Sequence, residues 1–457
     1  MPDLVVRDAQ IVLPAGIVQG SLVIDDGLVT QVTTASPPAA SREIDAKGRF
    51  VLPGVIDPHT HPGLVAPLER RLPLESRAMA AGGVTTVISY FRRPETYIPL
   101  VPERIALCER AFVQDFTFHL VLYGQGQVEE IERYVRELKV TSFKVYTNVR
   151  GRLGREMRMD ALPKQESIDV RAVDFDEHLL YSAFRALSEV EAPVRLNVHC
   201  EDSDVIAAEM SKVADRGERG LQAWNAARPD EAEALAMHQV GTLSREFNVP
   251  AYIPHVGSRG GIKAVGELLR LGTDVVAETC PHYLMLTDRT AGEEAKVAPP
   301  IRHEEDRLAV VAAVREGLLS TLGSDDIPYR LEEKRLENFW TQNSAFSGSG
   351  LMLPVALSSG LDVQLVARLT SANVARAFGL APRKGSLLPG SDADFVLVDM
   401  EAKREVHARD LAGSSDFSVY EGRSLVGWPV LTCSRGRVIF EAGKFPEEGG
   451  GRFLPRG

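Results

Sequence analysis

The sequence predicts an α/β fold, a (β/α)8 TIM barrel that carries a small β-sandwich domain built from the two ends of the chain. Eight compact apolar runs alternate with stretches of helical periodicity in the middle of the chain, and short alternating segments with turn residues occupy both ends. The length of 457 residues suits one large domain with a satellite. We therefore expect residues 1–52 and 383–457 to form the sandwich and a C-terminal arm, and residues 53–382 to form the catalytic barrel.

The two ends of the chain share the pattern of β-hairpins. Apolar and polar residues alternate over residues 4–32, and turn signals interrupt them at Pro14-Ala15-Gly16 and Asp25-Asp26-Gly27. The same pattern returns over residues 393–399 and 430–443. We expect these distant segments to join one sheet domain.

The middle of the chain has the rhythm of parallel strands joined by crossover helices, such as the helical pattern over residues 231–246. In barrel enzymes the chemistry lies at the C-terminal ends of the strands, so polar residues there are the functional candidates. The eight candidate strands lie near residues 54–59, 84–91, 116–123, 139–146, 194–200, 250–256, 274–279 and 319–325.

Composition excludes several kinds of function. A formal net charge of −11 and a pI near 5.5 argue against a nucleic-acid partner, because such binding depends on clustered Lys and Arg facing phosphates. No apolar run reaches the length of a membrane span, and no signal peptide opens the chain, so we expect neither membrane insertion nor export. The four cysteines are scattered singly, which favours the reducing cytoplasm: Cys108, Cys200, Cys280 and Cys433.

Four of the ten histidines lie at the ends of candidate strands. His59 and His61 are two residues apart, so the strand period of two turns both imidazoles the same way, as two nitrogen ligands of one divalent metal. His199 and His255 close the fifth and sixth runs. Any one of these residues alone is as well explained as a hydrogen-bonded loop histidine. The four together, at the rim of one barrel, predict a metal site.

Two further residues complete the predicted site. Asp325 follows the eighth strand, which neighbours the first strand across the barrel closure, so it can serve as a metal ligand and as a proton shuttle. Lys144 ends the fourth strand, where a protonated ammonium has no lone pair and would repel a metal. Its role therefore needs a chemical explanation.

With these residues in place, the chain resembles the amidohydrolase superfamily, and within it the cyclic amidohydrolases: hydantoinase, dihydropyrimidinase, allantoinase and dihydroorotase. The likeness covers nearly the whole chain. It is carried by residues 53–61, 81–87, 142–144, 198–201, 252–256, 279–284, 323–325 and 389–394.

The resemblance implies a carbamylated Lys144 whose oxygens bridge two metals. A metal-bridging hydroxide would then attack the ring carbonyl, and Asp325 would pass its proton to the departing nitrogen. Zinc suits such ligands, and manganese, iron or cobalt also fit. The implied ligands are His59, His61, Lys144 and Asp325 for one metal, with Lys144, His199 and His255 for the other.

The chain departs from hydantoinases at the residue that stabilises the oxyanion. Those enzymes carry a tyrosine five positions after the modified lysine, where this chain has Val149. Tyr146, Asn148 and His282 are the candidate replacements, and the sequence does not rank them. His282 lies in a segment shared with allantoinases and dihydroorotases, where hydantoinases usually have glutamine.

Other departures concern substrate choice. Dihydroorotases follow their histidine pair with an arginine that grips the substrate carboxylate, where this chain has Pro62. Arg92 or Arg93, after the second strand, could bind an anionic group instead. Asp326 stands where much of the family has histidine, and Asn343 is a candidate pocket residue. The remaining histidines match no ligand position and are expected to be structural: His119, His178, His238, His303 and His407.

The sequence therefore predicts a binuclear-metal hydrolase that opens a cyclic amide, imide or ureide ring. The alternatives are an allantoinase-like or dihydroorotase-like hydrolase of an anionic ring, and a hydrolase of acyclic N-acyl amino acids. A non-enzymatic scaffold related to dihydropyrimidinase would lack metal ligands, whereas all six positions are filled here. The tail at residues 449–456 resembles the C-terminal arm of hydantoinase oligomers, so we expect a homodimer or homotetramer.

Overall fold

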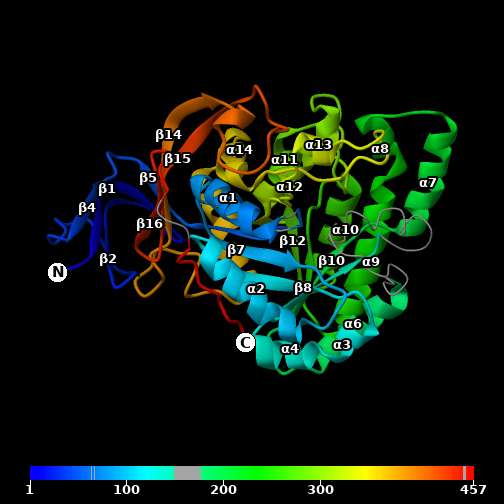
Figure 1. Ribbon diagram of the computed structural model, residues 1–457, viewed down its shortest axis with the longest axis horizontal. Coiled ribbons are helices and arrows are strands. Elements are labelled where there is room, and N and C mark those ends of the chain that lie inside the picture. The colour runs from blue at the N-terminus through cyan, green and yellow to red at the C-terminus, as the bar shows by residue number, and fades with distance from the viewer. Residues whose placement is uncertain (63, 66, 149–175, 446–448) are drawn as a thin grey trace.

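A barrel of parallel strands wrapped by helices occupies most of the molecule, and a mixed sheet lies at one end of it (Figure 1). The computed structural model describes residues 1–62, 64–65, 67–148, 176–445 and 449–457. In Figure 1 the N-terminus lies at the outer edge of the sheet, and the C-terminus lies against the barrel.

All eight predicted barrel strands are present, and they pair in parallel in the order of the sequence. Thr60 of the first strand forms a parallel bridge with Asp326, four residues beyond the last strand, and this contact closes the barrel. Both faces of these strands are buried, which is why they appear as continuous apolar runs. The strands are β6 (Val55–Thr60), β7 (Val84–Phe91), β8 (Asp115–Val121), β9 (Ser142–Tyr146), β10 (Arg195–His199), β11 (Ala251–Ile253), β12 (Val275–Thr279) and β13 (Thr321–Leu322).

Helices cover the outside of the barrel (Figure 1). The pattern over residues 231–246 is confirmed as α9 (Asp230–Phe247), which begins after Pro229, carries acidic residues in its first turn and ends at Asn248 in the left-handed conformation. None of the helices in the described part of the chain is long and apolar enough to cross a membrane. The others are α1 (Leu68–Ala81), α2 (Tyr97–Ala111), α3 (Gln125–Glu129), α4 (Ile131–Leu138), α6 (Glu177–Ser188), α7 (Ser203–Asp215), α8 (Leu221–Ala227), α10 (Arg259–Arg270), α11 (Pro281–Met285), α12 (Glu304–Glu316), α13 (Leu331–Lys334), α14 (Met352–Ser358), α15 (Val363–Ala367) and α16 (Asn373–Ala377).

Three barrel strands, β8, β11 and β13, end two or three residues earlier than the apolar runs suggest, and β9 begins three residues later. β11 stops at Ile253 and β13 at Leu322, so His255 and Asp325 lie just beyond their strands. Both residues have positive φ, 47° and 53°, a conformation that side chains with a Cβ seldom adopt. Such backbone turns the chain away from the ladder, so the strand pairing ends before these two residues.

The two ends of the chain share one mixed sheet, as predicted. Its strands run in the order β16, β15, β14, β5, β1, β2 and β3, with β4 also paired to β1, and they enclose a hydrophobic cluster of their own. The division of the chain at residues 52/53 and 382/383 stays a prediction. The strands are β1 (Leu4–Leu13), β2 (Gly16–Asp25), β3 (Leu28–Thr33), β4 (Arg42–Asp45), β5 (Phe50–Pro53), β14 (Phe395–Glu405), β15 (Ser424–Ser434) and β16 (Arg437–Glu441).

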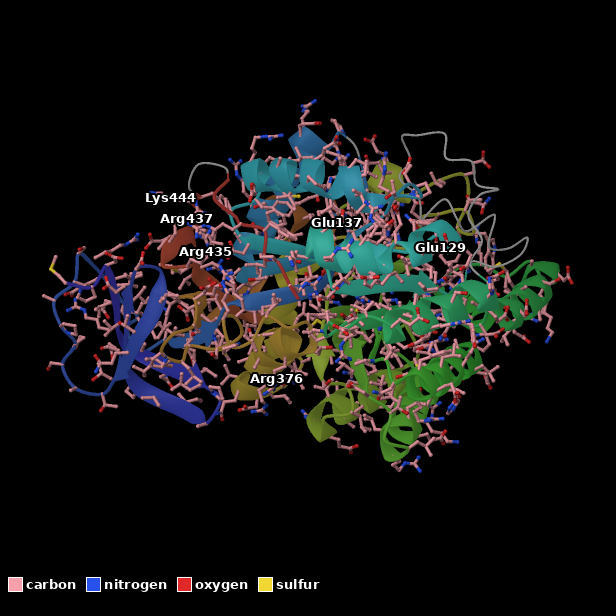
Figure 2. The ribbon with its side chains drawn as sticks, turned by 90° about the horizontal axis from the view of Figure 1, so that it is seen from below. Glu129, Glu137, Arg376, Arg435, Arg437 and Lys444 are labelled. Carbon is pink, nitrogen blue, oxygen red and sulfur yellow. The ribbon has the colours of Figure 1, made fainter. Side chains whose placement is uncertain are left out.

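The C-terminal tail packs against the chain's own barrel. Phe453 forms a parallel bridge with Phe116 at the start of β8, and Leu454 is buried beneath the barrel strands. Arg435 and Arg437, at the boundary between sheet and barrel (Figure 2), donate hydrogen bonds to the carbonyls of Gly450 and Gly449 respectively. These contacts explain the position of the tail without a second subunit, so its predicted role in oligomers stays a prediction.

Candidate active site

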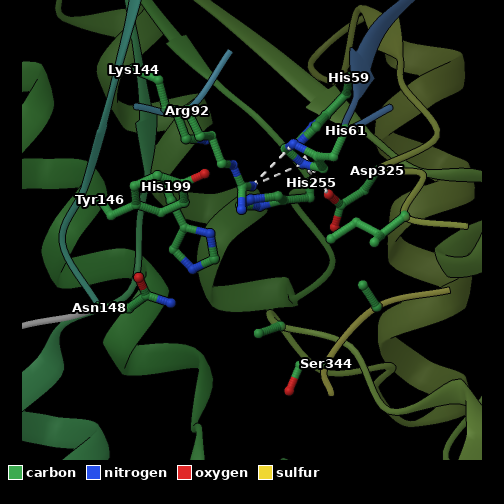
Figure 3. A pocket seen from close by; sticks show the side chains of 13 residues that line it. His59, His61, Arg92, Lys144, Tyr146, Asn148, His199, His255, Asp325 and Ser344 are labelled. Carbon is green, nitrogen blue, oxygen red and sulfur yellow. Dashed lines mark hydrogen bonds and ion pairs between the residues drawn. The ribbon is translucent and has the colours of Figure 1, made fainter. Parts of the chain in front are cut away.

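Side chains from six barrel strands converge on one pocket at the C-terminal end of the barrel (Figure 3). The pocket encloses about 590 Å³ including its mouth, a size that suits a small-molecule ligand. All six predicted metal ligands line it, together with two of the four predicted substrate-binding residues. The lining residues are His59, His61, Arg92, Lys144, Tyr146, Asn148, His199, His255, Ala298, Asp325, Ile327, Ser344 and Ala345.

His59, His61 and Asp325 form a group that can hold a metal ion. Asp325 Oδ1 lies 3.1 Å from His59 Nε2 and 3.2 Å from His61 Nε2. The candidate ligand atoms of the three residues all lie within 4.8 Å of one another. Burial opposes ionisation of Asp325, but the charge of His59 and hydrogen bonds with both histidines hold its pKa well below the usual value. The carboxylate is therefore charged, as a metal ligand or a base must be.

Glu278, on β12, orients this group through hydrogen bonds. Its carboxylate is fully buried, and it accepts hydrogen bonds from His59 Nδ1 at 2.7 Å, the Tyr252 hydroxyl at 2.7 Å and the His255 backbone N–H at 3.2 Å. Burial opposes protonation of His59, but Glu278 and Asp325 outweigh it and raise the pKa of His59 to about 9. Because Nδ1 is held by Glu278, Nε2 faces the pocket, the usual arrangement of a metal-binding histidine and its supporting carboxylate.

Gly323 makes room for that carboxylate. A Cβ at this position would overlap the Glu278 carboxylate and the Cβ of His59. The glycine after β13 therefore has a steric reason: it lets β13 pass close beside the residues that orient the site.

His199 is oriented in a similar way by a second buried carboxylate. Its Nε2 lies 2.7 Å from Glu201 Oε2, and Glu201 in turn forms a fully buried ion pair with Arg228. Burial lowers the pKa of His199 to about 4, so its imidazole is neutral, and Nδ1 remains available to a ligand. The ring centroids of His199 and His255 lie 4.4 Å apart, and those of His255 and His59 lie 5.3 Å apart. The pair His199 and His255 therefore lies next to the group of His59, His61 and Asp325.

Lys144, whose role the residue pattern alone did not explain, lines the same pocket. Its side chain is 1% exposed, and its Nζ has no hydrogen-bond partner among the described residues. The ammonium lies about equally far from the ring centroids of Tyr90 and Tyr146, at 5.0 and 5.1 Å. Burial lowers the pKa of Lys144 to about 7, so a large fraction of the amine is neutral and nucleophilic near neutral pH.

The two candidate arginines take different positions. Arg92 is 6% exposed and lines the pocket, with Nη2 3.0 Å from Nδ1 and 3.2 Å from Nε2 of His61. Arg93 is more exposed and forms an ion pair with Glu95 at 3.3 Å. Of the two, Arg92 is therefore the residue that can meet a ligand in this pocket.

The other predicted substrate-binding residues divide in the same way. Asn148 lines the pocket, and its Oδ1 is buried without a hydrogen-bond partner in the described structure. His282 and Asn343 are not among the lining residues. The His282 ring packs edge-on against Tyr283 and Phe346, and the Asn343 amide donates to the Glu333 carbonyl at 2.7 Å.

Two departures from the family pattern have different outcomes. Asp326 points away from the pocket and binds the following loop, accepting hydrogen bonds from Ser347 Oγ and from the backbone N–H groups of Gly348 and Ser349. Val149 lies outside the described residues. Asp326 is thus a loop anchor and is not among the residues that line the pocket.

Sequence reasoning missed Glu278, Glu201 and Arg228. A weak signal was present for Glu201, which follows His199 by two residues at the end of an apolar run. Glu278 lies within the seventh candidate strand, where a charged residue in an apolar run indicates a buried partner. Arg228 lies in a helical region with no pattern that singles it out.

Comparison with known proteins gives a consistent result. The sequence model of one family, described as the amidohydrolase family, matches residues 173–423. An allantoinase from Solibacter usitatus is 30% identical over 99% of this chain and 97% of its own length. A dihydroorotase from Methanothermobacter thermautotrophicus is 30% identical over 94% of this chain and 93% of its own. The solved structure of an L-hydantoinase (dihydropyrimidinase) from Arthrobacter aurescens superposes with a TM-score of 0.88 at 27% identity and covers 100% of both chains.

Proposed function

Because the chain belongs to the amidohydrolase family, we propose that it is a hydrolase that opens a cyclic amide, imide or ureide ring, as a hydantoinase or dihydropyrimidinase does. The observation that carries this proposal is the pocket at the end of the barrel, where imidazole, carboxylate and amine side chains meet. Its relatives carry the names allantoinase, dihydroorotase and L-hydantoinase, and ring-shaped substrates are what these names have in common.

We propose that this pocket binds two divalent metal ions. The residues fit such a group: His59 and His199 each have one ring nitrogen held by a carboxylate outside the pocket lining, which leaves the other nitrogen for a metal. Lys144 fits as a carbamate, because its buried Nζ lacks a partner and a neutral amine reacts with carbon dioxide. The proposed ligands are His59, His61, Asp325 and Lys144 for one ion, and Lys144, His199 and His255 for the other.

Zinc suits this mixture of nitrogen and oxygen donors, and manganese, iron or cobalt would fit it as well. When bound, such ions supply Lewis acidity, which makes a water molecule acidic at neutral pH and polarises a carbonyl group.

The chain's own residues then move the proton and hold the ring. Asp325 accepts the proton of the attacking water and delivers it to the ring nitrogen as the amide bond breaks, which is a base-then-acid cycle. Its low pKa keeps the carboxylate ready to accept that proton at neutral pH. Tyr146 and Asn148 both line the pocket, so either can donate a hydrogen bond to the developing oxyanion.

Arg92 favours a second candidate function, hydrolysis of a ring that carries an anionic group. Its guanidinium is permanently charged, buried and part of the pocket lining, and it can bind a carboxylate in a bidentate manner. The dihydroorotase-like and allantoinase-like alternatives use the same ring-opening reaction and differ in the group attached to the ring.

A panel of substrates tests the proposal. Purified protein loaded with zinc or manganese is assayed with hydantoin, dihydrouracil, succinimide, allantoin and dihydroorotate, and with N-acyl amino acids as the acyclic comparison. We expect ring opening. Turnover of the acyclic compounds alone would replace the proposal, and no turnover by a metal-loaded protein would favour a non-enzymatic scaffold.

The Arg92→Met variant separates the two ring classes. If the substrate is anionic, Arg92→Met should lower kcat/KM for the acidic ring by about a hundredfold, since it removes a charge-assisted pair, and leave neutral rings within about threefold. Equal losses on both classes would place Arg92 outside substrate selection.

We also propose that the protein works as a homodimer or homotetramer in the cytoplasm. The four cysteines are free and buried in the described structure, which suits a reducing compartment. Light scattering of the purified protein tests the oligomeric state directly.

A further inference from the structure

One wall of the candidate pocket is made of small side chains on two loops. Ala298 follows β12 and α11, and Ser344 and Ala345 precede α14. Because these side chains reach only a short distance from the backbone, the positions of the two loops set the width of the pocket. The opposite wall is built from strand ends, which the barrel itself holds in place.

Lys334 holds both loops with one ammonium group. It ends α13, its side chain is completely buried, and its Nζ donates to the carbonyls of Asn343 at 2.5 Å and Ala345 at 2.8 Å, on either side of Ser344. The same Nζ donates to the carbonyl of Lys296 at 2.6 Å, two residues before Ala298. A single charge therefore joins the two loops that carry the wall.

Lys296 fastens the start of the second loop. Its Nζ donates to the carbonyls of Phe339 and Trp340, both at 2.9 Å, and of Gln342 at 2.7 Å. The ammonium also lies 4.3 Å from the ring centroid of Trp224, a cation–π distance. Burial of an ammonium is costly unless such groups compensate it, and here the compensation comes from the backbone of the loop itself.

We propose that Lys334, supported by Lys296, is a positioning residue that fixes the wall of the pocket and thereby selects rings by the size of their substituents. This inference rests on the proposed ring hydrolysis for its substrate, but the contacts that carry it involve none of the proposed metal ligands. With the clamp intact, the wall holds a small ring close to Asp325 and the histidines. Without it, the loops separate, small rings bind less tightly and bulky rings are excluded less strictly.

The test compares Lys334→Met with Lys212→Met, which removes an exposed lysine on α7. Methionine keeps the length and volume of the side chain but donates no hydrogen bond. We expect Lys334→Met to raise KM for an unsubstituted ring about tenfold, to change kcat by less than about threefold, and to reduce the preference for unsubstituted over phenyl-substituted rings. Metal content should equal that of the wild type. A KM equal to that of Lys212→Met, or a loss of metal in parallel with kcat, would overturn the proposal.

Amide hydrogen exchange provides a readout that does not depend on activity. Exchange in residues 296–298 and 342–346 should be faster in Lys334→Met than in the wild type, while the barrel strands stay protected. If the wild type opens no ring, the proposed function fails, and the exchange experiment still decides whether the clamp exists. If Lys334→Met does not fold, Lys334→Arg, which keeps the charge but changes the donor geometry, should show both effects to a smaller extent. Wild-type KM and exchange in that variant would contradict the clamp.

Discussion

At the scale of single residues, Lys144 makes the sharpest prediction. Lys144→Ala should lose both metal and ring-opening activity, because it removes the amine whose carbamate we propose as the shared ligand. A short carboxylic acid such as acetate or propionate, added in solution, should partly restore both by supplying the missing oxygens. Elemental analysis and turnover measure the two effects, with Lys263→Ala on α10 as the exposed control. A metal-replete, active Lys144→Ala protein would refute the bridging role.

Residue types and their strand positions were enough to predict that the six candidate metal ligands share the pocket, since the C-terminal ends of parallel strands meet at one end of a barrel. The residues that orient them were not predictable in the same way. Glu278 supports His59 and His255 from a different strand, so its role depends on strand neighbours that one sequence does not reveal. Lys296 and Lys334 are still less predictable, because an isolated lysine outside an apolar run normally indicates an exposed surface.

At the scale of elements, the helices that follow the ligand strands also hold the ligands. Asp202 caps α7, three residues after His199, and its Oδ1 accepts hydrogen bonds from Asp204 N at 3.0 Å and Val205 N at 2.9 Å. Asp362 caps α15 with the same pattern, but no candidate ligand precedes it as His199 precedes Asp202. The chain therefore contains a matched pair of caps, one shortly after a candidate ligand and one without such a ligand.

We expect Asp202→Ala and Asp362→Ala each to lower the free energy of unfolding by about 1 kcal/mol, the usual cost of losing an aspartate cap. Only Asp202→Ala should also weaken metal binding, since it loosens the turn after His199. Urea unfolding of the metal-free proteins measures the first effect, and metal titration measures the second. Equal metal affinity in the two variants would show that the cap does not position the ligand.

The elements themselves followed closely from the pattern of apolar runs, and the early ends of β11 and β13 have one cause. β11 and β13 are short because the backbone turns into the left-handed region at His255 and Asp325. The pattern of apolar residues reports burial, and the residues before and after each of these two turns are buried. The apolar run therefore continues where the strand does not.

At the scale of the whole molecule, the barrel and the shared terminal sheet were predictable because each rests on a repeated pattern. The packing of the C-terminal tail was not. Its sequence resembles an oligomer arm, yet Phe453 and Leu454 fill the floor of the same chain's barrel. A short apolar segment can pack on any apolar surface, and its sequence does not indicate whether that surface belongs to its own barrel or to another subunit.

Lys384 connects the C-terminal segment to the barrel through buried ion pairs. It lies in the C-terminal segment with its side chain buried, and its Nζ lies 2.7 Å from both Asp115 at the start of β8 and Asp394, and 2.8 Å from Asp392. Lys384→Met should lower the free energy of unfolding at pH 7 by about 3–5 kcal/mol, because it leaves buried carboxylates without their cation. Urea unfolding measures the loss, with Lys403→Met on the exposed end of β14 as the control. A loss no larger than that of the control would show that the cluster is dispensable.

The pH dependence of this loss follows from the shifted groups of the cluster. Burial outweighs Lys384 at Asp394 and raises the pKa of that carboxyl above 3.8, whereas the pKa of its neighbour Asp115 is lowered. Burial raises the pKa of Asp115, but Lys384 and Arg435 outweigh it and hold the pKa below 3.8, so the stabilisation is complete above that value and disappears as the pH falls through the folded-state pKa. Burial lowers the pKa of Lys384, but the carboxylates outweigh it and raise the pKa above 10.5, so its contribution is complete below 10.5 and is lost at higher pH. The difference in stability between wild type and Lys384→Met should therefore be largest where both carboxylates and Lys384 are charged, above the raised pKa of Asp394 and below 10.5, and should narrow in acid as Asp394 and then Asp115 become protonated. A difference that stays constant down to the acid unfolding transition would mean that packing, and not charge, joins the C-terminal segment to the barrel floor.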